Sequence, residues 1–237
     1  MTTQDVSQLG TILGIWAHPD DETFMVGGIL SMAADNNQKV VCVTATKGES
    51  GTKDGSVSAE LGETRANELA AALDILGITE HSWLGYQDGT CSDVPQNEAV
   101  SQLVNLIEQH KPDTIITFAP DGLTGHPDHQ AVSRWAKTAA DKSNIHPNVY
   151  FAVHTQELYD SFMKVVDDEF NVYFATENPV FPPEASCDMV VHLEPATAER
   201  KMQALKIMPS QYGAWFEFLG DKGVEFAVGS EALVRSK

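Results

Sequence analysis

Two stretches of this chain combine an apolar run with a His-Pro-Asp sequence. Residues 12–22 read ILGIWAHPDDE, so polar residues follow an apolar run without a spacer. Residues 114–118 read TIITF, and residues 125–129 follow shortly afterwards as GHPDH. Short apolar runs of this kind are typical of buried strands. We therefore expect two buried strands that each deliver histidine and aspartate side chains to the same edge of a sheet.

Apolar, β-rich runs alternate with segments of helical period along most of the chain. Strands are expected at residues 11–17, 40–46, 81–84, 114–118, 149–153 and 189–193. Helices are expected at residues 24–34, 59–76, 97–110, 129–142 and 196–207. The alternation predicts an α/β fold, a Rossmann-like three-layer sandwich around a mostly parallel sheet. Because we find no repeat and no low-complexity linker, we expect one domain over residues 1–237.

Two later segments do not fit this alternation. Residues 173–183 contain Asn-Pro and Pro-Pro pairs, which favour an irregular loop. Residues 211–228 place aromatic side chains among glycines. This tail is expected to cover the site, to pack on a neighbouring subunit, or to complete the core.

Composition limits the classes of partner. Hydrophobic residues make up 42% and charged residues 21% of the chain, which is typical of a globular protein. The apolar runs are shorter than the roughly 18 residues of a membrane span. The N-terminus has no basic residue ahead of an apolar stretch, so we expect no secretory signal and a cytoplasmic protein. A net charge of −19 disfavours nucleic acid as a partner, because binding it requires Lys and Arg to neutralise phosphates.

The polar residues after the two runs have the spacing of metal ligands. His18 and Asp21 are separated by three positions, so one helical turn places both on the same ion, and His129 supplies a third ligand from the other stretch. Two imidazoles and one carboxylate, with positions left open, are typical of catalytic zinc, although Fe²⁺ and Mn²⁺ accept the same ligand types. Asp20 or Asp21 alone could instead cap a helix, but capping does not explain two His-Pro-Asp sequences. No glycine-rich fingerprint follows the first run, which disfavours a dinucleotide site.

With these two motifs the chain resembles the LmbE-like, or PIG-L, family of zinc-dependent N-deacetylases that act on N-acetylglucosaminyl compounds. Supporting similarities lie at residues 46–49, at Arg65 and Glu68, at residues 84–89, and at Lys201 and Ser210-Gln211. The resemblance implies a Rossmann-like fold, zinc held by His18, Asp21 and His129, and a homo-trimer or homo-hexamer. Similar sequences often have His where this chain has Met208, and some have Tyr at the position of Thr124. Both departures lie in regions that shape the pocket or assist the oxyanion. The resemblance therefore does not establish that this chain acts on the usual sugar substrate of the family.

The resemblance and the remaining residues imply a hydrolytic mechanism. Asp20 is expected to take a proton from a water activated by zinc, which attacks an acetamide carbonyl. A protonated His126 is expected to hold the oxyanion, with Asp128 orienting the imidazole and favouring its charge. The products would be acetate and a free amine.

Residues around this centre are expected to bind a small N-acylated, sugar-like substrate. Arg65 is the candidate clamp for a hydroxyl or phosphate, and Glu49 and Asp88 are candidate acceptors from sugar hydroxyls. Arg65 with Glu68 could instead be a helix-surface pair, and Asp88 part of an ordinary turn. Other amidohydrolases, phosphoesterases and a non-catalytic metal-binding module remain alternatives.

Overall fold

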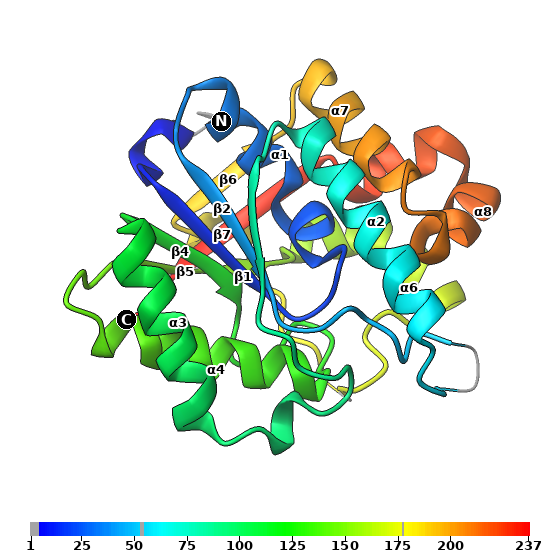
Figure 1. The fold of residues 1–237 in the computed structure, drawn as a ribbon. Helices are drawn as coiled ribbons and strands as arrows, with labels where there is room; N and C mark the ends of the chain where they lie inside the picture. The colour runs from blue at the N-terminus through cyan, green and yellow to red at the C-terminus, as the bar shows by residue number, and fades with distance from the viewer. Residues whose placement is uncertain (1–4, 53–54, 177) are drawn as a thin grey trace.

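The computed structural model describes residues 5–52, 55–176 and 178–237, and its strands form a seven-stranded sheet (Figure 1). The order across the sheet is β3-β2-β1-β4-β5-β7-β6. The strands are β1 (Ile12–Trp16), β2 (Val40–Thr44), β3 (Glu80–Trp83), β4 (Thr114–Phe118), β5 (Asn148–Val153), β6 (Met189–His192) and β7 (Ser230–Arg235). The first five pair in parallel, whereas β7 pairs antiparallel with both β5 and β6. The predicted α/β fold with a mostly parallel sheet is confirmed.

Helices cover both faces of the sheet and make the structure three-layered (Figure 1). They are α1 (Asp21–Asp35), α2 (Ala59–Leu76), α3 (Gln96–His110), α4 (Pro127–Lys142), α5 (Gln156–Leu158), α6 (Lys164–Phe170), α7 (Pro195–Lys206) and α8 (Pro209–Val228). Helices α3 and α4 pack together on one face, and α1, α2 and α7 pack together on the other, with α8 against α7. Because both faces are covered, β1, β2 and β4 are buried along their whole length and read as continuous apolar runs.

The order of the strands places a crevice between β1 and β4. From β1 the chain proceeds outward through β2 to β3, whereas β4 lies on the other side of β1 and is followed by β5. In open α/β sheets ligands bind at such a point, outside the carboxyl ends of the strands. The loops after β1 and after β4 carry the two His-Pro-Asp sequences, so the fold brings both to this crevice.

The C-terminal part contains elements that the sequence pattern did not indicate. The tail at residues 211–228 is α8, a helix interrupted at Gly220, whose φ of 65° is unfavourable for other residues. Strand β7 follows it and carries the buried Glu231, whose carboxylate accepts hydrogen bonds from the backbone of Gly28 (2.7 Å) and Ile29 (2.7 Å). These amides need an acceptor because α1 is non-helical at Val26. Strand β7 thus stabilises the helix that carries Asp21.

None of the helices within the described residues is sufficiently long and apolar to cross a membrane.

Candidate metal centre and active site

Asp21 is fixed at the junction between β1 and α1. It lies in the first turn of α1, and its Oδ2 accepts hydrogen bonds from the backbone N–H of His18 (2.7 Å) and of Ala17 (3.2 Å). A carboxylate at a helix N-terminus is also stabilised by the helix dipole. The three-residue spacing of His18 and Asp21 therefore folds into one tight turn, with both side chains at the crevice.

His129 reaches the same place from the loop after β4. It lies in the first turn of α4, its ring stacks on Phe118 with the centroids 4.0 Å apart, and its Nδ1 is 3.0 Å from the carbonyl oxygen of Gly122. A carbonyl oxygen only accepts, so the hydrogen of the neutral ring lies on Nδ1. The lone pair on Nε2 of His129 is then directed into the crevice.

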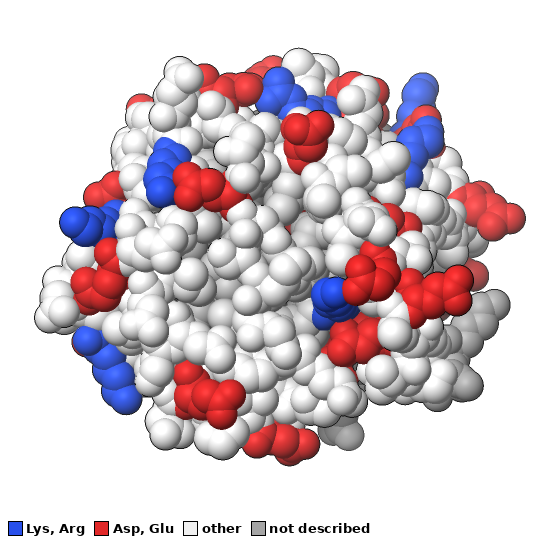
Figure 2. All heavy atoms as spheres, in the orientation of Figure 1, with Lys and Arg blue, Asp and Glu red and all other residues white. Residues whose placement is uncertain are grey.

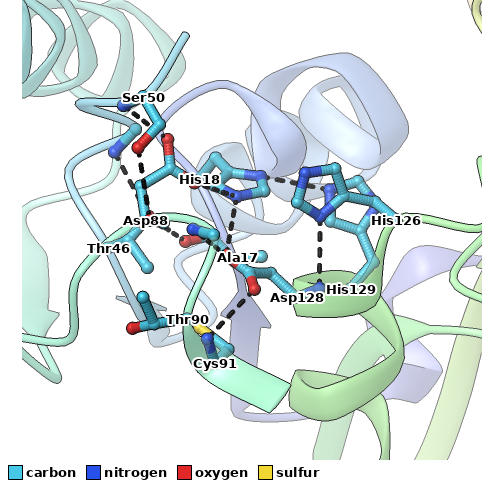
Figure 3. Close-up of polar contacts among 12 residues, drawn as sticks. Ala17, His18, Thr46, Ser50, Asp88, Thr90, Cys91, His126, Asp128 and His129 are labelled. Atoms are coloured by element: carbon cyan, nitrogen blue, oxygen red, sulfur yellow. Dashed lines mark hydrogen bonds and ion pairs between the residues drawn. The ribbon is translucent and has the colours of Figure 1, made fainter. Parts of the chain in front are cut away.

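His18 meets His129 across the crevice (Figure 3). Its Nε2 lies 2.9 Å from Oδ1 of Asp88 and donates to that carboxylate, and its Nδ1 lies 3.1 Å from Nε2 of His129. Asp21 faces both rings, with Oδ2 3.8 Å from Nδ1 of His18 and Oδ1 3.5 Å from Nε2 of His129. In the metal-free protein one proton joins these two nitrogens, and a metal ion that replaced it would lie between the two imidazoles beside the Asp21 carboxylate.

These separations fit a divalent metal. Ligands at zinc–nitrogen and zinc–oxygen distances of about 2.0–2.1 Å in a tetrahedron lie about 3.3 Å apart. The imidazole of His126 also contributes a nitrogen to a group in which the ligand atoms of His18, His126 and His129 lie within 4.8 Å of one another. The residues therefore supply either three imidazoles or two imidazoles with the carboxylate of Asp21, and both sets suit zinc.

Burial and neighbouring charges shift the pKa values of His18, His129 and Asp21 in different directions. Burial opposes the charge on His18, but hydrogen bonds to Asp128 and Asp88 raise its pKa to about 10. The pKa of His129 lies well below its ordinary value because of burial and the nearby charge of His18. Burial raises the pKa of Asp21 to about 8. The proton on His18 and a metal ion compete for the same pair of nitrogens, so metal binding at this centre releases a proton.

Asp88 and Asp128 lie behind His18 (Figure 3). Asp128 is fully buried, and its oxygens accept from the backbone N–H of Gly89 (2.8 Å) and Cys91 (3.0 Å), with Oδ2 also 3.4 Å from Nε2 of His18. The structure differs here from the expectation that the Asp128 carboxylate orients His126. The backbone N–H of Asp128 instead donates to Nδ1 of His126 (3.1 Å), because Asp128 follows a helix-capping imidazole in the first turn of α4.

Asp20 adopts an unusual backbone conformation beside the three histidines. Its φ is 123°, a region that costs a non-glycine residue about 1–3 kcal/mol and is most often found at functional sites. Its Oδ1 accepts from the Arg65 guanidinium at 3.2 Å and its Oδ2 from the Tyr212 hydroxyl at 3.1 Å. Burial raises the pKa of Asp20, and the charges of Arg65 and His18 oppose this rise.

Arg65 and Glu49 hold the loops around Asp20. Arg65 is 5% exposed and donates to the carbonyl oxygens of Pro19 (2.9 Å) and Gly48 (2.9 Å), so it is not part of a helix-surface pair. The two oxygens of Glu49 accept from the backbone N–H of Lys47 (3.1 Å) and of Asp88 (3.1 Å). Glu49 and the terminal nitrogens of Arg65 are occupied by protein groups, whereas Nε of Arg65 is buried without a hydrogen-bond partner among the described residues.

Tyr212 is a site residue that the sequence did not indicate. It lies in the first turn of α8, which is attached to α2 by hydrogen bonds from the backbone N–H (3.1 Å) and hydroxyl of Ser210 to Glu68. The nearest signal was the Ser210-Gln211 pair two positions earlier. The side chain reaches Asp20 only because the bonds from Ser210 to Glu68 hold the first turn of α8 beside the middle of α2, which a local pattern does not reveal.

The metal centre opens into a pocket of about 390 Å³. The three histidines, Asp20, Asp21, Arg65 and Asp88 line it together with apolar side chains from α1, α8 and the loop after α6. Of the candidate residues named from the sequence, Glu49 and Asp128 do not line the pocket within the described part of the chain. Thr124 does line it, whereas Met208 is buried at the start of α8.

Comparisons with known proteins agree with the fold and the motifs. A family model described as PIG-L, GlcNAc-PI de-N-acetylase, matches residues 13–140. The 1D-myo-inositol 2-acetamido-2-deoxy-alpha-D-glucopyranoside deacetylase of Streptomyces scabiei is 34% identical over 162 residues, which are 58% of this chain and 50% of that protein. The chain thus spans about half the length of the first curated relatives it matches.

Two solved structures illustrate how widely the fold is used. N,N'-diacetylchitobiose deacetylase from Pyrococcus horikoshii is 21% identical with a TM-score of 0.66, over 98% of this chain and 87% of that one. The 4-carboxy-2-hydroxymuconate hydratase of Pseudomonas putida is 17% identical with a TM-score of 0.65, over 96% of each chain. At these identities the likeness concerns the fold alone, and the two neighbours are named as a deacetylase and a hydratase. The family assignment rests on the sequence match over more than half of the chain: the protein belongs to the PIG-L (GlcNAc-PI de-N-acetylase) family.

Proposed function

We propose that this protein is a zinc-dependent hydrolase that removes an acetyl or similar acyl group from the amine of an N-acetylated sugar-type substrate. The observation that carries the proposal is the pair of imidazole nitrogens, of His18 and His129, that face each other 3.1 Å apart beside Asp21 in a pocket. Membership of a family described as de-N-acetylases and the names of the curated relatives support the reaction type. The proposal covers residues 1–237 as one domain.

His18, Asp21 and His129 would hold the metal, and Asp88 and Asp128 would orient His18 from behind through its Nε2. Zinc is the proposed ion, while Fe²⁺ and Mn²⁺ accept the same ligand types. A divalent metal bound there would lower the pKa of a water molecule and polarise the acyl carbonyl.

The proton transfers are assigned to Asp20. Its carboxylate is held between Arg65 and Tyr212 at the pocket, and in this proposal it is not a metal ligand. It takes one proton from the attacking water and returns it to the nitrogen as the C–N bond breaks, which yields acetate and an amine. Burial and the neighbouring charge of Arg65 act on the pKa of Asp20 in opposite directions. A carboxyl group in this setting can both accept the proton from water and release it to the nitrogen.

His126 is proposed to stabilise the oxyanion as a neutral ring. Its Nδ1 accepts the Asp128 backbone N–H, so the ring hydrogen lies on Nε2 and is available to a substrate oxygen. Burial and the charge of His18 lower the pKa of His126, which also favours the neutral form. The protonated imidazolium expected from the sequence is therefore not needed for this role.

The substrate-binding roles of Arg65, Glu49 and Asp88 are revised in this proposal. Each makes hydrogen bonds within the protein that fix the loops or His18, so we assign them to positioning of the site. The occupied guanidinium of Arg65 also gives a phosphoesterase little support. A homo-trimer or homo-hexamer stays a prediction, to be checked by light scattering of the purified protein.

The test compares products and metal content. Zinc-loaded protein is expected to release acetate from N-acetylglucosamine conjugates and no phosphate from model phosphate esters. Asp20→Asn should lose acetate release while retaining zinc, and His129→Gln should lose both. Full activity of Asp20→Asn with normal zinc content would contradict the base assignment, and metal binding without hydrolysis of any substrate would favour a non-catalytic module.

A further inference from the structure

One side of the pocket is built from aromatic side chains. We define the aromatic wall as Phe24, Phe174, Tyr212 and Trp215, all of which line the pocket. The ring of Phe24 stacks on Tyr212, with centroids 5.9 Å apart, and meets Trp215 edge-on at 5.5 Å. Phe170 supports Trp215 from behind with a stacked contact at 5.7 Å.

The wall extends from the catalytic groups to the pocket rim. Tyr212 binds Asp20, and the ring of Phe174 lies edge-on to His126 with centroids 5.9 Å apart. Phe174 is nevertheless 58% exposed, and Trp215 is half-buried. Large aromatic side chains left exposed at the rim of a pocket are typical of a ligand-binding surface, since burial against a ligand is favourable.

The pocket has no free positive charge within the described residues that line it. Arg65 is the one Lys or Arg among them, and its terminal nitrogens donate to Pro19, Gly48 and Asp20. The carboxyl groups of Asp20, Asp21 and Asp88 line the same pocket. Among the described lining residues an anionic substrate group would find no Lys or Arg other than Arg65.

The net negative charge of the whole molecule also disfavours anionic ligands. The chain has 34 Asp and Glu against 15 Lys and Arg, and Figure 2 shows acidic side chains, with basic ones among them, around a central area of one face without charged residues. A negative field of this kind slows the approach of anions and does not hinder neutral ligands.

Resting on the proposed N-deacylase function, we propose that the substrate is an uncharged N-acylated amino sugar with an aryl or alkyl substituent, which packs against the aromatic wall. Trp215 is then a specificity-determining residue. Phosphorylated amino sugars are poor substrates, because they lack a cationic partner and gain nothing from the wall.

The experiment measures kcat/KM for acetate release by the zinc-loaded protein. The substrates are N-acetylglucosamine, its 6-phosphate, and 4-nitrophenyl N-acetyl-β-glucosaminide. We expect the aryl sugar to be the best and the phosphate the poorest. Trp215→Ala should lower kcat/KM for the aryl sugar about two- to tenfold, the range for one aromatic contact, and change the free sugar less than twofold.

Phe226→Ala is the matched control, because Phe226 also lies on α8, is 71% exposed, and does not line this pocket. It should leave all three values unchanged. A preference for the phosphate, or an equal loss for both neutral sugars in Trp215→Ala, would overturn the inference.

A binding measurement separates this inference from the proposed reaction. The aryl sugar should quench tryptophan fluorescence of the wild type, and the quenching should be lost in Trp215→Ala. Quenching without acetate release from any substrate would refute the proposed function and support the wall as a binding surface. Acetate release with no quenching and no aryl preference would refute the inference and support the function.

Discussion

Replacing Tyr212 by Phe removes one oxygen from the active site. The hydroxyl is 3.1 Å from Oδ2 of Asp20, and the ring is buried against Phe24 and Trp215. The variant keeps these ring contacts, so the change is confined to one hydrogen bond. Asp20 retains its contact with Arg65 through the other oxygen.

The structure sets the expected size of the effect. A hydrogen bond to a charged group contributes about 1.5–3 kcal/mol, and about 1.4 kcal/mol corresponds to a tenfold change in rate. If the hydroxyl holds Asp20 in the reactive position, kcat/KM should fall about 10- to 100-fold. The hydroxyl also lowers the pKa of Asp20 against the opposing effect of burial, so its loss lets that pKa rise. Since the base must be unprotonated, the acidic limb of the pH–rate profile should move to higher pH.

The assay is the pH dependence of kcat/KM for acetate release, with zinc content measured at each pH. Tyr159→Phe is the control, because Tyr159 also faces a carboxylate, Asp167 at 3.5 Å, and does not line the pocket. A Tyr212→Phe profile with the same acidic limb and the same height as the wild type would refute the role of Tyr212. A uniform loss of rate with an unshifted acidic limb would show that the hydroxyl positions Asp20. It would refute the claim that the hydroxyl lowers the pKa of Asp20.

Three further predictions concern metal retention, stability and pH. Asp88→Asn should weaken zinc binding about 10- to 100-fold, measured by competition with a chelator, because His18 loses its charged acceptor; retention equal to wild type would contradict this. Glu231→Gln should destabilise the protein by about 3–5 kcal/mol in urea unfolding, since it leaves the buried Lys201 without its partner at 2.6 Å. Burial lowers the pKa of His154 to about 3, so below about pH 6.5 the unfolded chain binds a proton that the folded protein does not. In metal-free protein the stability advantage of the wild type over His154→Gln should therefore fall by about 1.4 kcal/mol per pH unit below pH 6.5, and a constant difference would contradict this.

The core of the fold and the place of the site could be predicted because they depend on local patterns. The apolar runs of β1 and β4 are buried on both faces, and each ends at a His-Pro-Asp sequence. A parallel sheet brings the carboxyl ends of both strands to one edge, so the proximity of His18 and His129 follows from the pattern. The spacing of His18 and Asp21 is realised within a single turn.

The elements that the sequence did not indicate depend on contacts between distant segments. Strand β7 is a short antiparallel addition to the sheet, and Glu231 in it meets α1 more than 200 positions earlier in the chain. Tyr212 reaches Asp20 because α8 packs on α7 and Ser210 in its first turn binds Glu68 of α2. Neither contact leaves a periodic signal, because each depends on where an entire element packs.

The direction of the Asp128 carboxylate could not be predicted from the sequence either. Asp128 and His126 are two positions apart, and neighbours in sequence suggest a pair. The carboxylate turns to the backbone N–H groups of Gly89 and Cys91, because a buried charge needs several donors and an imidazole offers one. With Asp88 it lies beside Nε2 of His18, which places the hydrogen bond on that nitrogen and directs Nδ1 toward His129. A loop after β3 therefore determines which nitrogen of His18 is available to a metal.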